Sequence, residues 1–162
     1  MISLKKQSRG FTIVELLIVI VVIGILAGLV ITTYNGIQQK ARNTERTTDL
    51  KTFQSQLEAY YANNGFYPSS ADLGGTGSTN VTFIQSNMKG MDKETLRDPN
   101  VPAGTDSAGY GLATGTPSAV GKYSYTPAPD GCDNSTNGDC TSYKLQAKPE
   151  GSGDVIEYDS LN

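Results

Sequence analysis

One carboxylate stands inside the longest apolar run of the chain. Phe11 to Ile31 spans 21 residues in which Glu15 is the single charged side chain. An ionisable group near the centre of a membrane costs roughly 2.5 to 3.5 kcal/mol on insertion scales, so a segment that needed only hydrophobicity would not be expected to carry one. Glu15 therefore indicates a function in which its charge meets a partner.

Two cysteines, Cys132 and Cys140, enclose a polar loop rich in turn-forming residues. A single close pair fits one disulfide in an exported domain better than a zinc site, which needs four ligands. Closing so short a loop contributes under about 3 kcal/mol in the chain-entropy description, so the bond would mainly fix the shape of the loop.

The same loop partly follows the order of oxygen ligands in a calcium-binding loop, with Asp133, Asn137 and Asp139 as candidate ligands. Lys144 stands where that pattern requires a bidentate glutamate, and several carboxylates would be needed for useful affinity. Calcium is therefore the weaker alternative to a simple disulfide-clamped hairpin, and we expect no metal.

The residue types that most enzymes need are missing. The chain contains no histidine, which removes imidazole as a base and as a metal ligand. Its serines fall in predicted loops without a visible base, and there is no glycine loop of the kind that cradles phosphate. We expect neither catalysis nor a cofactor.

Two acceptor patterns for N-linked glycosylation begin at Asn80 and Asn134. The pattern is short and has many false positives, so the sequence leaves glycosylation open.

The elements that must position these residues begin with a helix. At about 1.5 Å per residue, residues 11–31 are long enough to cross a hydrocarbon core of about 30 Å. A secretory signal peptide cut near Ala27 is the alternative. The length of the apolar run, the charge of Glu15 and a helical continuation after Ile31 favour a transmembrane helix.

The helix is predicted to continue as an amphipathic segment over residues 32–64. Apolar residues recur three or four apart late in this segment, and it contains no proline before Pro68. Asn63, Asn64 and Gly65 are typical of a helix end. We interpret the interleaved charges as a solvated face, with pairing between subunits as the alternative; they are Lys40, Arg42, Glu45, Arg46, Asp49 and Lys51.

Residues 65–162 are predicted to form a globular head. The stretch 69–121 is rich in Gly, Ser, Thr and Pro and predicts a long loop with a short helix near Lys93 to Leu96. Alternating patterns predict three strands, around Tyr123 to Tyr125, Tyr143 to Ala147 and Val155 to Tyr158. The expected fold class is α+β, with a long N-terminal helix packed on a small antiparallel sheet.

The junction before the apolar run resembles that of type IV prepilins and type II secretion pseudopilins. The basic stretch 5–9 is followed by Gly10, Phe11 and then Glu15 as the fifth residue after the junction. The resemblance implies that residues 1–10 are a leader, cut between Gly10 and Phe11 by a prepilin peptidase, and that the new amine of Phe11 is methylated. Residues 57–68 also resemble the exit of the long helix in that family, so a pilin-like fold is implied.

Two charge consequences follow from such a cut. Removing Lys5, Lys6 and Arg9 with the leader changes the formal net charge from −3 to −6. An acidic chain is not expected to bind nucleic acid directly, because phosphate contacts need well-placed cations. In lipid, Glu15 would have no partner in its own helix other than the Phe11 amine. We expect Glu15 to pair with the Phe11 amine of a neighbouring copy and to set the axial register between subunits.

Gly24 and Gly28 have the small-xxx-small spacing that lets neighbouring helices approach closely. This spacing favours helix packing between subunits, although the pattern alone is weak evidence.

The implied function is that of a structural subunit of a type IV pilus, in motility, adhesion or DNA uptake. The alternatives are a pseudopilin of a type II secretion or competence system and, in another class, a membrane-anchored adhesin, which would need neither Glu15 nor the Gly10–Phe11 junction. Implied partners are copies of the same chain, the prepilin peptidase, a platform protein, an assembly ATPase and the membrane. The precursor would be a single-pass protein of the inner or cytoplasmic membrane, and the assembled chain a cell-surface filament.

Overall fold

The computed structural model describes residues 10–74, 77–102 and 107–162. The chain divides into two compact units, one ending at Gln38 and the other comprising Gln39–Asn162. Residues 1–9 of the expected leader, with Lys5, Lys6 and Arg9, lie outside the described residues.

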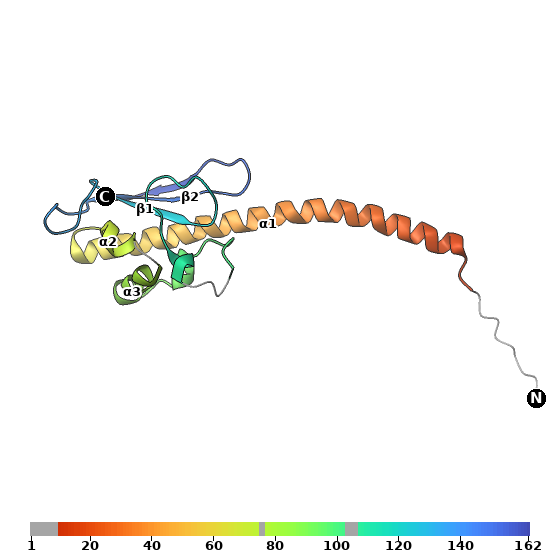
Figure 1. Ribbon diagram of the computed structural model, residues 1–162, viewed down its shortest axis with the longest axis horizontal. Coiled ribbons are helices and arrows are strands. Elements are labelled where there is room, and N and C mark those ends of the chain that lie inside the picture. Colours follow the sequence, from red (N-terminus) through yellow and green to blue (C-terminus); the bar gives the residue numbers. More distant parts are fainter. Residues whose placement is uncertain (1–9, 75–76, 103–106) are drawn as a thin grey trace, which may run out of the picture. The chain divides into compact units, whose positions relative to one another are not determined.

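Helical elements come first in the chain and strands last (Figure 1). The helices are α1 (Ile13–Asn64), α2 (Ser70–Leu73) and α3 (Gly77–Asn87), followed by the 3-10 helices η1 (Lys93–Leu96) and η2 (Ser107–Tyr110). The strands are β1 (Tyr123–Ala128), β2 (Ser142–Ala147) and β3 (Ile156–Asp159). This confirms an α+β fold with a long N-terminal helix and a small antiparallel sheet.

Helix α1 ends where the sequence predicts. Gly65 follows its last residue with a φ of +83°, a conformation that favours glycine, and its amide donates to the carbonyl of Tyr61 over 2.7 Å. The side-chain amide of Asn64 donates to the carbonyl of Tyr60 over 2.8 Å. Two carbonyls of the last turn are therefore satisfied, and Pro68 lies just beyond.

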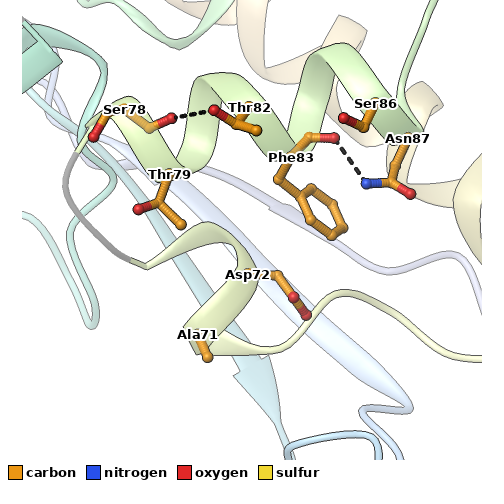
Figure 2. A pocket seen from close by; sticks show the side chains of 8 residues that line it. All are labelled: Ala71, Asp72, Ser78, Thr79, Thr82, Phe83, Ser86 and Asn87. Carbon is orange, nitrogen blue, oxygen red and sulfur yellow. Dashed lines mark hydrogen bonds between the residues drawn. The ribbon is translucent and has the colours of Figure 1, made fainter.

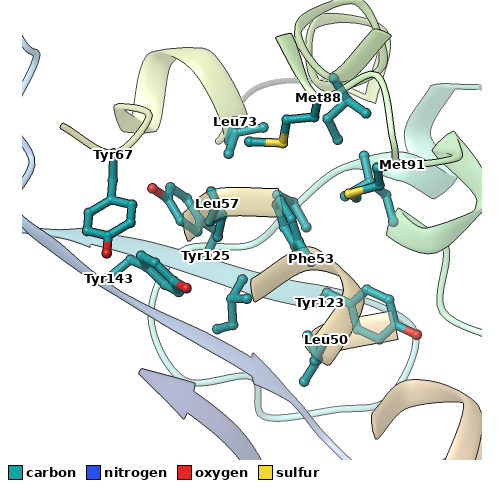
Figure 3. Close-up of a cluster of buried hydrophobic side chains, with 14 of the residues drawn as sticks. Leu50, Phe53, Leu57, Tyr67, Leu73, Met88, Met91, Tyr123, Tyr125 and Tyr143 are labelled. Carbon is teal, nitrogen blue, oxygen red and sulfur yellow. The ribbon is translucent and has the colours of Figure 1, made fainter. Parts of the chain in front are cut away.

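The core of the second unit forms between α1, the sheet and the segment that follows α1. Leu50, Phe53 and Leu57 are fully buried, and their spacing of three and four residues places them on one face of α1. Figure 3 shows them among tyrosines of the strands and apolar residues from α2 and the segment after α3. The rings of Phe53 and Tyr125 have centroids 6.1 Å apart.

The three strands pair in sequence order, and both pairings are antiparallel. Tyr125 lies opposite Leu145, which lies opposite Tyr158. Lys144 precedes Leu145 in β2 and faces the other way. Its side chain is exposed and forms ion pairs with Glu157 and Asp159 of β3. The predicted alternation is confirmed, with apolar residues toward the core and charges toward water.

A loop residue covers the outer edge of β1. The amide of Ala113 donates to the carbonyl of Tyr123 over 2.8 Å, and the amide of Tyr125 donates to the carbonyl of Ala113 over 2.9 Å. The hydroxyl of Ser124 donates to the carbonyl of Gly115. This segment explains why Ser124 is fully buried although it points away from the core.

The prediction of a long loop over 69–121 is wrong for α3, which has 11 residues, and for the short α2. Helix α3 contains Gly, Ser, Thr, Asn and Val, all poor helix formers, so local propensity does not reveal it. Burial stabilises it instead: Ile84 lies in the core, and the side-chain amide of buried Asn80 donates to the carbonyl of Tyr110 over 3.1 Å. The short helix expected near Lys93 to Leu96 is present as η1.

Candidate functional site

The start of α1 is a capping box formed by Thr12 and Glu15. The carboxylate oxygen Oε2 of Glu15 accepts from the amide of Thr12 over 2.9 Å and from its hydroxyl over 2.7 Å. The amide of Glu15 donates to the Thr12 hydroxyl oxygen over 3.2 Å. Such reciprocal bonds satisfy amides that the first turn of a helix leaves without partners.

The expectation that Glu15 has no partner in its own helix other than the Phe11 amine is therefore wrong. Thr12 supplies that partner, because a residue three positions before a glutamate at a helix start can reach its side chain. The signal was in the sequence as the pattern Thr-x-x-Glu before an apolar run. Thr12 is thus a site residue that sequence reasoning missed.

Gly10 and Phe11 precede the helix, which begins at Ile13. Both residues are exposed, and the Phe11 side chain is 84% exposed. Their peptide bond is not locked in helical hydrogen bonding, so the expected cleavage would not require the helix to unwind. The bond lies four residues before Glu15 in the chain, which places the proposed new amine at the same helix end as the carboxylate.

The apolar part of α1 is uncovered in the chain. From residue 13 to residue 31 its large apolar side chains are between 48% and 84% exposed. Fully burying each such side chain is worth about 1.5 to 3 kcal/mol, so a contiguous surface of this size is strongly unfavourable in water. The helix is also long and apolar enough to cross a membrane. Lipid or other protein must cover this surface.

Gly24 and Gly28 lie within this uncovered part. Apart from neighbouring residues and the nearby backbone of α1 itself, no described atom lies within 4 Å of the position that a Cβ would take at either residue. Close helix packing at these glycines therefore stays a prediction about contacts with another molecule.

The charges of the second half of α1 behave differently from the prediction. Lys40, Glu45 and Lys51 are exposed, as a solvated face requires. Arg46 is fully buried, however, and its guanidinium binds both carboxylate oxygens of buried Asp98 over 2.8 Å each. The solvated-face interpretation is wrong for Arg46 because the residue lies one turn before Leu50 on the buried face of the helix.

A second carboxylate completes this ion-pair network. Glu150 binds Arg42 over 2.5 Å and Arg46 over 3.2 Å. Its hydrogen bonds to Arg42 and then to Arg46 lower the pKa of the Glu150 carboxyl to about 2. The network ties α1 to the segment after η1 and to the loop between β2 and β3, so it is a structural feature of the head.

The predicted disulfide is present. Cys132 and Cys140 are bonded, with Cα atoms 5.2 Å apart. Asn134 holds the loop against the exit of α1: its side-chain amide donates to the carbonyl of Tyr67, and its side-chain oxygen accepts from the amide of Cys140, both over 2.8 Å. The loop is therefore fixed by a covalent bond and by one asparagine side chain.

Of the candidate calcium ligands, Asp133 and Asn137 lie in contact with each other. The Asp133 carboxylate accepts hydrogen bonds from the amides of Ser135 and Asn137 over 2.9 and 2.8 Å, and from the side chain of Asn137 over 3.1 Å. These bonds lower the pKa of the Asp133 carboxyl, the Asn137 amide contributing most. Among the described residues, no three acidic, histidine or cysteine side chains gather as a metal site would require. Asp133 serves instead to shape the turn, and Asp139 follows that turn.

Both glycosylation patterns use asparagines whose side-chain nitrogens are already hydrogen-bonded. Asn80 is fully buried, and the Asn134 nitrogen donates to Tyr67. A glycan would replace one of the two N–H groups of such a nitrogen and needs space beside it, which fully buried Asn80 does not offer in the folded chain.

Comparison with known proteins gives three findings. Residues 5–31 match the family described as prokaryotic N-terminal methylation motif. The chain is 30% identical over 126 residues to the type II secretion system core protein G of Dickeya chrysanthemi, which covers 76% of this chain and 80% of that protein. No solved structure matches.

Other core G proteins match over shorter stretches of the chain. The protein of Pectobacterium carotovorum subsp. carotovorum is 38% identical over 63 residues, or 39% of this chain and 40% of that protein. The protein of Escherichia coli (strain K12) is 37% identical over 62 residues, or 38% of this chain and 43% of that protein. These two matches span less than half of the relatives' length.

Proposed function

The chain belongs to the family of type IV pilins and pseudopilins, and on that premise we propose that it is a structural subunit of a filament that assembles through the first part of α1. The observation that carries the proposal is the uncovered apolar surface of residues 13–31, with one charged side chain at its start. A lipid anchor alone would explain the surface. Thr12 caps the helix through the Glu15 carboxylate, but a charge in lipid remains costly, and a cationic group of another copy at this helix end would offset that cost.

Processing prepares this helix end. A peptidase cuts between Gly10 and Phe11, and the new amine of Phe11 is methylated, as the motif match over residues 5–31 favours. The precursor sits in the inner or cytoplasmic membrane with one span. Because the mature N-terminus then lies next to Thr12, the amine and the Glu15 carboxylate form a polar cluster at the start of an otherwise apolar helix.

Assembly joins the polar clusters of neighbouring copies. The Glu15 carboxylate, held by Thr12, pairs with the Phe11 amine of the next subunit, and the low dielectric of the filament core strengthens the attraction. The apolar helices pass directly from lipid to a groove between other helices, because exposing about 20 apolar residues to water would cost far too much. A platform protein and an ATPase on the cytoplasmic side supply this transfer.

The relatives favour a pseudopilin. Their name, type II secretion system core protein G, refers to a secretion system, and one match extends over 80% of the relative. We therefore propose a filament of the pseudopilus type, which supports protein secretion. A surface pilus is the second candidate, favoured by the head loop that Cys132, Cys140 and Asn134 fix in place, since such a loop resists proteolysis.

Three measurements test these proposals, two of them on cells with and without the gene. Mass spectrometry of the mature chain is expected to give a methylated Phe11 as the N-terminus; an N-terminus near Gly28 would contradict filament assembly altogether. Electron microscopy and analysis of the medium then separate the two filament types. Loss of secreted proteins without loss of surface fibres supports the pseudopilin, and loss of surface fibres with normal secretion supports the pilus.

A further inference from the structure

A cleft of about 520 Å³ lies between α2 and α3 on the head. The cleft is open to solvent, since six of the eight residues that line it are exposed. Figure 2 shows Ala71 and Asp72 of α2 on one side of the cleft and Thr79 and Phe83 of α3 on the other, with the Asp72 carboxylate turned away from Thr79. Neither the filament proposal nor the ion-pair network uses these residues.

The charge of the lining narrows the chemistry of a ligand. Of the described residues that line the cleft, Asp72 alone is charged, and the others are hydroxyl, amide, methyl or aromatic side chains. Phosphates and other anions bind where arginine or lysine is available, which is not the case here. One carboxylate is too few for a divalent cation, which takes several oxygen ligands. A neutral polar ligand fits best.

The hydrogen bonds that the lining residues already make further restrict which ligands the cleft can bind. Thr82 and Asn87 each donate to the backbone carbonyl four residues earlier, over 2.9 Å in both cases. Their side-chain oxygens can still accept. Asp72 uses Oδ2 to accept two bonds from Ser69, and Oδ1 accepts none from the residues that the structure describes. The cleft therefore offers mainly acceptors, to which the exposed hydroxyls of Thr79 and Ser86 add groups that do either. A ligand that presents several hydrogen-bond donors, such as hydroxyl groups, fits this lining.

Phe83 supplies an apolar surface in the same cleft. Its ring is half-buried and lies 5.6 Å from the ring of Tyr60, which in turn contacts Phe66 at 6.2 Å. A ring held by neighbouring rings is fixed before a ligand arrives, so little conformational entropy is lost on binding. Such a ring matches a ligand that has an apolar face of C–H groups beside its hydroxyls.

We propose that this cleft binds a neutral carbohydrate chain, with one sugar ring against Phe83 and its hydroxyls bonded to Asp72, Thr79 and the acceptors of Thr82 and Asn87. The binding is weak for a single cleft, with a Kd of about 1 mM. In a filament each copy presents the same cleft, so a polysaccharide that spans several copies binds more tightly than one ring does. The inference about a single chain does not depend on filament assembly.

The test uses the full chain purified in a zwitterionic detergent, since detergents with sugar head groups would compete. Cellotriose and tri-N-acetylchitotriose are titrated separately, with saturation-transfer NMR on the sugar protons as the readout. At least one of the two trisaccharides is expected to bind saturably. Comparing their affinities shows whether the cleft prefers a plain glucan or an N-acetylated glycan. Failure of both trisaccharides up to about 50 mM, well above the expected Kd, overturns the proposal.

Three variants locate the binding. Phe83→Leu keeps an apolar contact with Tyr60 but removes the flat ring, and is expected to weaken binding at least about tenfold. Thr79→Val keeps the shape of an exposed side chain and removes one hydroxyl, for a loss of about fivefold. Gln85→Ala, an exposed residue of α3 outside the lining, is the matched control and should bind as the parent does. Equal binding by Phe83→Leu, Thr79→Val and the control would place the sugar elsewhere and overturn the assignment, whatever becomes of the filament proposal.

Discussion

Residues 13–38 and residues 39–64 belong to one helix, yet they find their partners in different places. In the first segment every side chain that the structure describes is exposed, and the segment contains one charged residue, Glu15. In the second, Arg46, Leu50, Phe53 and Leu57 are fully buried within the chain's own head. The difference teaches that one helix can bury its side chains within its own fold along one segment and expose them for contact with another molecule along the next. Changes in the first segment should affect assembly, and changes in the second should affect folding.

The largest expected effect lies in the first segment. Glu15→Val should abolish filaments, because the carboxylate that meets the neighbouring Phe11 amine is lost, while membrane insertion and cleavage stay normal since the helix becomes more apolar. Electron microscopy counts the filaments, and immunoblotting shows the mature chain. Thr12→Ser keeps the capping hydroxyl and is the control, with near-normal filaments expected. Normal filament numbers in Glu15→Val cells, with the variant confirmed as the main subunit, would remove the proposed role of Glu15.

Arg46→Met is the corresponding change in the second segment. Removing one partner of a fully buried ion pair leaves Asp98 charged and unpaired, which costs roughly 3 to 5 kcal/mol of unfolding free energy. Denaturant unfolding, followed by the near-UV circular dichroism of the tyrosines, measures the loss. Arg42→Met provides the matched comparison, because the Arg42 side chain is 28% exposed and its loss should cost well under half as much. If the two variants were equally stable, burial would not be what sets the contribution of each arginine to the free energy of unfolding.

Loss of the disulfide should have a smaller effect on the head and none on the first segment of α1. Replacing both Cys132 and Cys140 by alanine is expected to lower the free energy of unfolding by about 2 to 3 kcal/mol. The main cause is that the unfolded chain gains conformational entropy without the bond. Limited proteolysis should then cut near Asn137, whereas filaments still form. A double variant that lost filaments while its head stayed folded would show that the loop takes part in assembly.

The smallest expected effect concerns Asp49, also in the second segment. Burial raises the pKa of its carboxyl from 3.8 to about 6, Glu45 and Asp98 add to the rise, and the hydrogen bond from the Tyr123 hydroxyl opposes it. The raised pKa means that the carboxyl favours the folded state below about pH 3.8, and this contribution is lost as the pH rises through about 6.

Asp49→Asn keeps an acceptor for Tyr123 and removes the charge. It should therefore be more stable than the parent at pH 7.5, by about 1 kcal/mol after allowance for partial exposure, and equal to it near pH 4. Thermal unfolding at the two pH values measures this. A gain of the same size at both pH values would mean that the charge of Asp49 is not the cause.

Features that depend on residues close together in the chain were predictable from the sequence. The end of α1 at Asn64, the three strands and the bond between Cys132 and Cys140 all follow from local rules of periodicity, turn chemistry and cysteine spacing. The capping role of Thr12 follows from such a rule too, through the pattern Thr-x-x-Glu at the start of a helix.

Features that depend on distant residues were not predictable in this way. Arg46 and Asp98 are separated by 52 positions, and nothing near either residue indicates that they pair. Helix α3 likewise exists because Ile84 and Asn80 are buried against other parts of the head, not because its residues favour a helix. The cleft between α2 and α3 could not be foreseen for the same reason, since both of its walls were expected to be loop.

The edges of the small sheet matter once many copies are crowded together. Sheet edges with unpaired amides invite strands of a neighbouring chain to add to them, and a filament would hold heads side by side for its whole length. Here Ala113 already pairs with β1, and Pro127 in the same strand has no amide to donate. At the other edge β3 has four residues, two of them the acidic Glu157 and Asp159. The head is thereby protected against strand exchange and amyloid-like stacking at high local concentration.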